Sequence, residues 1–180
     1  MNVRLCFPFR IFCGNSFSIL VFTFYFFLIS CAGSRGRTNL VQPIDESRLK
    51  KLLTQAQGKA VLLNFWATWC DPCVEEFPDL IKLARDFRPH GLEVILVSLD
   101  ELEDLNSKIV PFLGKHGVNF RTYFKKTRDD EVFINTIDAK WSGAIPATFI
   151  YDTQGNLAKR FVAQQSFDTL IEAVRPLLPK

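Results

Sequence analysis

The sequence of 180 residues has little glycine, proline and histidine, few cysteines, and almost no excess of charge of either sign. Nine glycines, nine prolines and no internal repeat exclude collagen-like, coiled-coil and low-complexity classes. The net charge of +3 falls to +1 without the apolar first 30 residues, which hold two arginines and no acidic residue. A near-neutral domain lacks the basic surface that nucleic acids require, so we expect no nucleic-acid partner. The length fits one globular domain with an appendage.

Five cysteines are too few and too unevenly placed for a scaffold held together by disulfides. Cys6, Cys13 and Cys31 lie in or at the end of the apolar leader, so the remaining chain keeps one close pair, Cys70 and Cys73. This pair predicts redox chemistry, with half of a zinc site and two inert thiols as the alternatives. Zinc needs four ligands, and the only further candidates are two histidines that each precede a glycine at a predicted helix end.

The first 30 residues have the order of an export signal. Arg4 and Arg10 come first, a stretch without charge follows from 11 to 29, and small residues come next. An uncleaved transmembrane helix is the alternative, because about 20 apolar residues span a bilayer. However, Gly-Asn-Ser at 14–16 interrupts the stretch. We therefore predict a signal peptide over residues 1–30.

The tetrapeptide Leu28-Ile29-Ser30-Cys31 resembles the lipobox of bacterial lipoproteins. The resemblance implies that the Cys31 thiol takes up a diacylglycerol and becomes the mature N-terminus, anchored to a membrane outside the cytoplasm. Ala32 after the cysteine favours the outer membrane if the cell has two, and the protein would then be periplasmic. The polar stretch that follows predicts a tether over residues 31–44 and a folded domain over residues 45–180.

From residue 45 onward, the pattern predicts strands that alternate with helices and then a closing hairpin and helix. Two nearly continuous apolar runs, 60–66 and 92–99, are typical of strands covered on both faces. Further elements are expected as follows: helices over 45–57, 72–87, 103–115 (kinked or late-starting at Pro111), 133–141 and 166–177, a strand over 118–124, and a hairpin of 147–151 with 157–162. This order indicates an α/β sheet with helices on both faces.

Cys70 and Cys73 stand where the strand 60–66 turns into the helix 72–87. At a helix N-terminus, unpaired N–H groups and the helix dipole favour a thiolate on Cys70. Two intervening residues bring Cys73 round one turn, so that its sulfur can reach the first. Because Cys73 shares an apolar helix face with Phe77, we expect a buried Cys73 and an exposed Cys70 that attacks the substrate.

Residues 64–78, with the run Trp-Cys-Asp-Pro-Cys-Val-Glu-Glu-Phe-Pro at 69–78, resemble the TlpA/ResA type of exported thiol-disulfide oxidoreductase. The family pattern Trp-Cys-x-x-Cys-x-x-Glu-x-Pro is met at every position. The resemblance implies a thioredoxin fold over residues 45–180: a central mixed sheet flanked by helices, with an extra helix at 124–142 before a cis-proline. It also implies that Glu76 assists Cys70 and Cys73 in catalysis, with a solvated helix residue as the alternative for Glu76.

Other residues around the motif have expected roles from the same resemblance. The family's cis-proline segment faces the disulfide and helps to hold the substrate, and Ile145-Pro146 is similar to it. Trp66 and Trp69 flank the pair and are expected to shape its surface, with Trp69 in contact with substrate. A packing residue is the alternative for each of them. Asn64 stands where cytosolic thioredoxins carry an aspartate, so proton transfer has to come from another residue. The family's N-terminal hairpin is not evident in this sequence.

The resemblance implies an enzyme that reduces exported proteins bearing thiols or disulfides, as a monomer, with no cofactor or metal besides the cysteine pair. A membrane electron donor would re-reduce it, and family substrates include apocytochrome cysteines in cytochrome c maturation and protein thiols in general. A thiol peroxidase is one alternative, although its Thr-x-x-Cys motif is absent because Thr68 stands two residues before Cys70. A copper-handling module would need Cys-x-x-x-Cys, and a non-catalytic domain would not need both cysteines.

The lipobox-like tetrapeptide generates the first testable prediction. In cells fed a labelled fatty acid, Cys31→Ala abolishes incorporation and leaves an unprocessed precursor, because the variant has no thiol to acylate. Cys13→Ala is the matched control and incorporates label like the wild type. Labelling of Cys31→Ala at the wild-type level would assign the anchor to the apolar helix instead.

Overall fold

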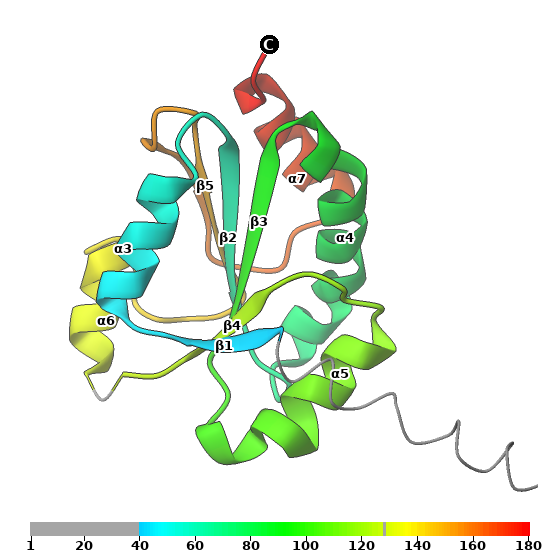
Figure 1. Cartoon of the computed structure of the whole chain (residues 1–180), viewed down its shortest axis with the longest axis vertical. Coiled ribbons are helices and arrows are strands. Elements are labelled where there is room, and N and C mark those ends of the chain that lie inside the picture. The colour runs from blue at the N-terminus through cyan, green and yellow to red at the C-terminus, as the bar shows by residue number, and fades with distance from the viewer. Residues whose placement is uncertain (1–39, 128) are drawn as a thin grey trace, which may run out of the picture. The chain divides into compact units, whose positions relative to one another are not determined.

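Six strands form one sheet in the order β1-β4-β3-β2-β5-β6 in the computed structural model, which describes residues 40–127 and 129–180 (Figure 1). The strands are β1 (Val41–Ile44), β2 (Ala60–Trp66), β3 (Leu92–Ser98), β4 (Thr122–Lys125), β5 (Ala147–Tyr151) and β6 (Leu157–Phe161). β1 to β4 are parallel to one another, whereas β5 is antiparallel to β2 and β6. The mixed sheet predicted from the sequence is therefore confirmed. The predicted signal peptide and Cys31 lie outside the described residues.

Helices cover both faces of this sheet, as predicted (Figure 1). On one face lie α3 (Glu46–Gln55) and α6 (Asp130–Ile137), and on the other α4 (Asp71–Phe87), α5 (Val110–Lys115) and α7 (Phe167–Val174). Side-chain caps begin three of the helices: Asp45, Asp129 and Ser166 each accept a hydrogen bond from a backbone N–H of the first turn. The fold thus has one sheet between two helical layers.

β2 is the centre of the structure and is buried along its whole length. Its side chains alternate between the two layers, with Val61, Leu63 and Phe65 in the core below α3 and α6. Leu62 and Trp66 belong to the core below α4, α5 and α7. Because β2 is covered on both faces, its sequence is apolar at almost every position instead of at every second one.

The predicted tether is wrong for its last residues, because Val41–Ile44 form the edge strand β1. Leu40 and Ile44 accept backbone hydrogen bonds of 2.9 and 2.8 Å from the β4 region, and the side chains of Val41 and Ile44 are buried. The segment contains a proline, which an edge strand tolerates because one of its edges needs no donor. The folded domain therefore includes residues before position 45.

Three other elements differ in extent from their predictions. The strand expected over 118–124 begins only at Thr122, and the helix expected to reach Trp141 ends at Ile137. The helix expected over 103–115 begins with short 3-10 and π-helical segments, Leu102–Asp104 and Leu105–Ile109. Its α-helical part starts at Val110, so that Pro111 lies in the first turn, where its missing N–H leaves no bond unmade.

The reassignment of β1 generates a stability prediction. Ile44→Ala lowers the free energy of unfolding by about 2–4 kcal/mol, because it removes a fully buried side chain and leaves a cavity. Lys51→Ala on the exposed face of α3 is the control and changes it by less than about 0.5 kcal/mol. Urea unfolding measures both, and an Ile44→Ala effect no larger than the control's would return residues 41–44 to the tether.

Candidate functional site: a redox disulfide at a helix N-terminus

Cys70 and Cys73 form a disulfide at the start of α4. The chain leaves β2 at Trp66, turns through three residues and reaches Cys70, which is the N-cap of the helix. Cys70 is 6% exposed and Cys73 is 1% exposed. The predicted order of burial is therefore confirmed, but the expectation of an exposed Cys70 is wrong for this oxidised state. Only a small part of Cys70 reaches solvent.

The N-terminal turn of α4 supplies the electrostatic environment of Cys70. The N-cap residue has no side-chain bond to the helix, and Pro72 occupies the first turn. The first N–H groups of a helix have no intrahelical acceptor and carry a partial positive charge. When the disulfide is reduced, this charge stabilises a thiolate on Cys70 more than one on Cys73, which lies a turn further into the helix.

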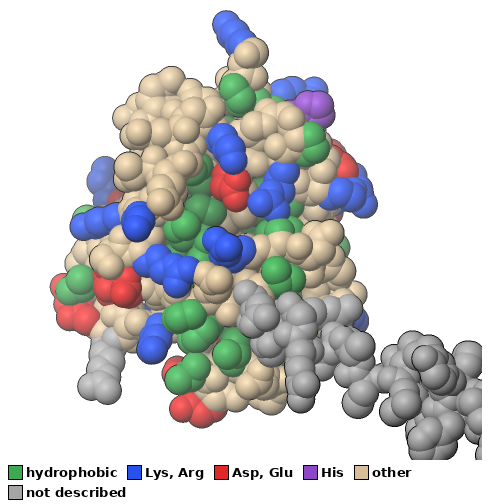
Figure 2. Space-filling model, in the orientation of Figure 1, with side chains coloured by type: hydrophobic (Ala, Val, Ile, Leu, Met, Phe, Trp, Pro, Cys, Tyr) green, Lys and Arg blue, Asp and Glu red, His purple; other side chains and the backbone are tan. Residues whose placement is uncertain are grey.

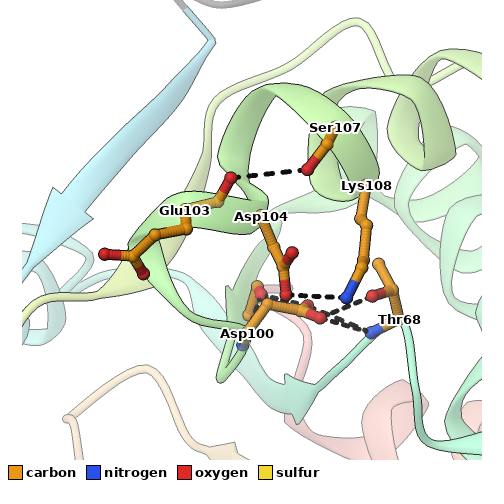
Figure 3. Close-up of polar contacts among 7 residues, drawn as sticks. Thr68, Asp100, Glu103, Asp104, Ser107 and Lys108 are labelled. Carbon is orange, nitrogen blue, oxygen red and sulfur yellow. Dashed lines mark hydrogen bonds and ion pairs between the residues drawn. The ribbon is translucent and has the colours of Figure 1, made fainter.

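A buried carboxylate, Asp100, holds the turn that leads to Cys70 (Figure 3). Its two oxygens accept hydrogen bonds from the Thr68 backbone N–H at 3.1 and 3.0 Å, and one of them also accepts from the Thr68 hydroxyl. The Ser98 hydroxyl donates to the second oxygen at 2.6 Å. Sequence reasoning missed this contact, although an aspartate just beyond the end of a buried parallel strand was a signal, because such strand ends meet at one edge of the sheet.

Glu76 lies on α4 one turn after Cys73, and its side chain is buried, being 1% exposed. Its carboxylate accepts hydrogen bonds from Asn64 Nδ2 at 3.2 Å and from the Gln165 backbone N–H at 2.8 Å. Burial raises its pKa to about 7, and the negative charge of Asp79 acts in the same direction, while the hydrogen bond from Gln165 opposes the shift. The solvated-residue alternative for Glu76 is therefore wrong.

Asn64 links Glu76 to the neighbouring strand. Its Nδ2 also donates to Thr148 Oγ1 of β5 at 3.0 Å, and its Oδ1 is buried with no hydrogen-bond partner among the described residues. The side chain is neutral, so it orients the carboxyl group without competing for its proton. Thr148 and Gln165 were not found by sequence reasoning, because they lie 84 and 89 residues from their partners.

The residues predicted to touch substrate have different exposures. Trp69 is 63% exposed beside Cys70, whereas Trp66 is buried against the rings of Phe77 and Phe112. For Trp66 the predicted surface role is therefore wrong, and the alternative of a packing residue is confirmed. The Ile145–Pro146 peptide bond is cis, as the resemblance implied. Pro146 directly precedes β5, whose Ala147 pairs with Phe65 of β2, so this segment lies beside the strand that leads to the disulfide. Contact of Trp69, Ile145 and Pro146 with substrate stays a prediction.

The alternative of a zinc half-site gains no ligands from the tertiary structure. Within residues 40–127 and 129–180, no group of three or more histidine, cysteine, aspartate or glutamate side chains is arranged to hold a metal ion. His116 packs against the ring of Phe112, with centroids 4.5 Å apart, and His90 ends a 3-10 helix at the surface.

Comparison with known proteins places this site among thiol-disulfide oxidoreductases. The sequence profile of the AhpC/TSA family matches residues 42–160. The thiol-disulfide oxidoreductase ResA of Bacillus subtilis is 34% identical over 129 residues, which are 71% of this chain but only 65% of that protein. ResA of Halalkalibacterium halodurans is 27% identical over 165 residues, 87% of this chain and 88% of that protein. The TlpA/ResA resemblance inferred from the motif is confirmed.

Solved structures confirm the thioredoxin fold. A thiol:disulfide interchange protein of the thioredoxin family from Chlorobium tepidum has a TM-score of 0.57 at 24% identity, covering 69% of this chain and 83% of that one. A secreted thiol-disulfide isomerase from Corynebacterium glutamicum has a TM-score of 0.59 at 21% identity, covering 69% of this chain and 74% of that one. At these identities the likeness concerns the fold alone.

The raised pKa of Glu76 generates a prediction for stability against pH. An unfolded glutamate loses its proton near its ordinary pKa of 4.5, whereas folded Glu76 keeps it to about 7. The unfolded state therefore binds fewer protons between these values, and the free energy of unfolding falls with rising pH by about 3 kcal/mol from this group. In Glu76→Gln we expect this decrease in the free energy of unfolding with rising pH to be absent.

Urea unfolding of the oxidised protein at pH 4.5 and pH 7.5 measures the effect. Glu75→Gln, which changes the exposed neighbour on the same helix, is the control and keeps the wild-type fall. If Glu76→Gln also keeps it, the carboxyl group of Glu76 titrates normally in the folded protein.

Proposed function

The chain belongs to the AhpC/TSA family, and from this membership and the disulfide at the start of α4 we propose that it reduces disulfides of proteins outside the cytoplasm. The observation that carries the proposal is the unequal position of Cys70 and Cys73. Cys70 lies at the helix N-terminus with its edge open to solvent, and Cys73 lies behind it, within bonding distance and shielded. Such a pair can form a bond to a partner and then release it.

The exchange takes place in two steps. The Cys70 thiolate attacks one sulfur of the substrate disulfide, which breaks the substrate S–S bond, forms a mixed disulfide and releases the other substrate sulfur as a thiolate. Cys73 then loses its proton and attacks Cys70 Sγ, which releases the second substrate thiolate. Two electrons pass to the substrate, its two sulfurs take up two protons, and the chain is left with the Cys70–Cys73 disulfide.

Glu76 is the proposed proton acceptor for Cys73. It follows Cys73 by one turn of α4, and its pKa of about 7 lets it take up and release a proton near neutral pH. Asn64 cannot do this, because an amide does not titrate in this range. The hydrogen bonds from Asn64 and from the Gln165 backbone hold the carboxyl group in place during both steps.

The surface around the disulfide favours a polypeptide partner with apolar and basic residues near its cysteine. Trp69 and Leu102 are 63% and 52% exposed, and the bonds between Thr68 and Asp100 hold their two loops together. Exposed acidic side chains flank them: Asp71, Glu75, Glu101 and Glu103.

Two substrate ranges are proposed. One is the apocytochrome cysteines that some members of the family reduce, and the other is exported thiol proteins in general.

The proposed place of action is the outer side of a bacterial membrane, with a lipid on Cys31 as the anchor. Support comes from the leader and from the lipobox-like tetrapeptide in the sequence. In the part of the chain that the structure describes, no helix is both long and apolar enough to cross a bilayer. Because the space outside the cytoplasm is oxidising, we also propose a membrane electron donor that returns the pair to its dithiol form.

Trapping of the mixed disulfide tests the exchange. Cys73→Ala, expressed as the full chain, accumulates adducts with other proteins that dithiothreitol releases, because the second step cannot occur. Cys70→Ala is the control and accumulates at least tenfold fewer adducts. Adducts in equal amount from both variants contradict the assigned roles, and rapid peroxide consumption without adducts would indicate a thiol peroxidase.

The direction of exchange generates a prediction for the redox potential. Asp71, next to Cys70, disfavours the thiolate and therefore the dithiol form, by a small amount because the charge is exposed. We expect a potential nearer to roughly −270 mV, the thioredoxin value, than to roughly −120 mV, the value of a strong oxidase. Equilibration of the protein with glutathione measures it, and a value in the oxidase range would reverse the proposed direction.

A further inference from the structure

The turn between β2 and α4 carries Cys70 and lies beyond the end of the sheet. Its first carbonyl group is still held by the chain after β3, because the Trp66 carbonyl accepts a hydrogen bond from the Leu99 N–H at 2.8 Å. Within the turn, the Cys70 N–H donates to the Ala67 carbonyl at 3.3 Å, which is longer than the usual range of about 2.7–3.2 Å. The ladder between β2 and β3 stops at Trp66, so the N–H of Thr68 needs a partner from outside these strands.

Asp100 is that partner, and its own position is fixed (Figure 3). Thr68 donates to the Asp100 carboxylate through both its backbone N–H and its hydroxyl group. On the other side, the Ser98 hydroxyl donates to Asp100 Oδ2 at 2.6 Å and accepts from the Asp100 N–H at 3.0 Å. The carboxylate is therefore held from two sides, and these charge-assisted bonds offset the cost of burying it at 2% exposure.

The bonds of Asp100 use backbone and hydroxyl groups, and none of them uses a cysteine sulfur. Reduction therefore breaks the S–S link between Cys70 and Cys73 but removes no bond of this set. In the dithiol form, the turn alone then determines where the Cys70 thiol lies relative to α4. This position matters because the stabilisation of a thiolate by a helix N-terminus falls off within the first turn of the helix. The space-filling view in Figure 2 shows, low on this face, the hydrophobic and acidic side chains of the same end of the molecule.

We propose that Asp100 is a positioning residue for disulfide exchange, which keeps the reduced Cys70 at the N-terminus of α4 through its bonds to Thr68. The inference rests on the proposed function. Asp100 acts on the turn two residues before Cys70 and not on the sulfur itself. Loss of its bonds lets the turn move, which lowers the share of Cys70 that is thiolate and makes the dithiol form less favoured. The rate of attack and the equilibrium between dithiol and disulfide then both depend on a residue of a separate loop.

Equilibration with glutathione tests the proposal on the full chain in detergent micelles. Asp100→Asn leaves one acceptor oxygen in place of two. We expect its equilibrium to move at least threefold toward the disulfide, and its reduced pair to attack oxidised glutathione at least threefold more slowly. Thr68→Val keeps the charge of Asp100 but loses the hydroxyl donor, and it moves both values in the same direction by at least twofold. Thr68→Ser keeps the donor and behaves like the wild type.

Asp104→Asn is the matched control for charge. This carboxylate lies in the same loop, and it bonds to Lys108 Nζ at 2.9 Å (Figure 3). We expect both values to stay at the wild-type level in this variant. Loss of a negative charge near Cys70 would favour its thiolate, so an effect of charge moves the equilibrium toward the dithiol, opposite to the effect of lost bonds.

Three outcomes would overturn the proposal. They are wild-type values in Asp100→Asn, a shift of Asp100→Asn toward the dithiol or a shift equal to that of Asp104→Asn, and equal losses in Thr68→Ser and Thr68→Val. If Asp100→Asn does not fold, the comparison of Thr68→Val with Thr68→Ser decides. In each of these cases the wild type still exchanges with glutathione, so the proposed function stands. A wild-type protein that does not exchange contradicts the proposed function, and this inference with it.

Discussion

The continuous pairing of β2 with β3 is the constraint on which the rest of the structure depends. The register runs without a break from Ala60 opposite Leu92 to Trp66 opposite Ser98. Because β2 and β3 are parallel, both strands finish at the same end of the sheet. This brings the turn after β2 next to Asp100, which follows β3. The carboxylate of Asp100 then satisfies a backbone donor in the turn that would otherwise be unpaired, which fixes where α4 begins and where Cys70 lies.

A buried polar cluster ties α4 to the other half of the sheet at a cost in stability. Glu76, Asn64 and Thr148 are all buried, and burial of a carboxylate is unfavourable unless it is bonded or protonated. The structure meets this condition in two ways. Asn64 and the Gln165 backbone donate hydrogen bonds to the Glu76 carboxyl group, and the raised pKa of Glu76 keeps that group protonated up to about pH 7. The proposed role of Glu76 in proton transfer accounts for a buried carboxyl group that stability alone would not retain.

The two ends of the sheet differ because β4 follows β3 for only two residues. At the carboxyl end of β3, Val97 and Ser98 pair with β4, so the sheet is continuous at the end that supports the disulfide. At the amino end the two strands separate, and a groove of about 310 Å³ lies there, lined by residues that include Leu52, Glu93 and Arg121. One sheet thus positions the disulfide at one end and borders a groove at the other.

The sequence by itself determined the elements and the reactive pair. Apolar runs of strand length, capping residues such as Asp45 and Ser166, and the Cys-x-x-Cys spacing are local signals, and each of them led to the observed element.

Only the tertiary structure decided that residues 41–44 form a strand, since a short segment with a proline has no periodic signal and becomes a strand by pairing with β4. The burial of Glu76 and Trp66 was likewise undetermined, because its causes lie on distant segments. The contact of Thr68 with Asp100 joins residues 32 apart, and that of Glu76 with Gln165 joins residues 89 apart. Local patterns carry periodicity and caps, whereas the chemistry of this site depends on which strand ends and loops the fold brings together.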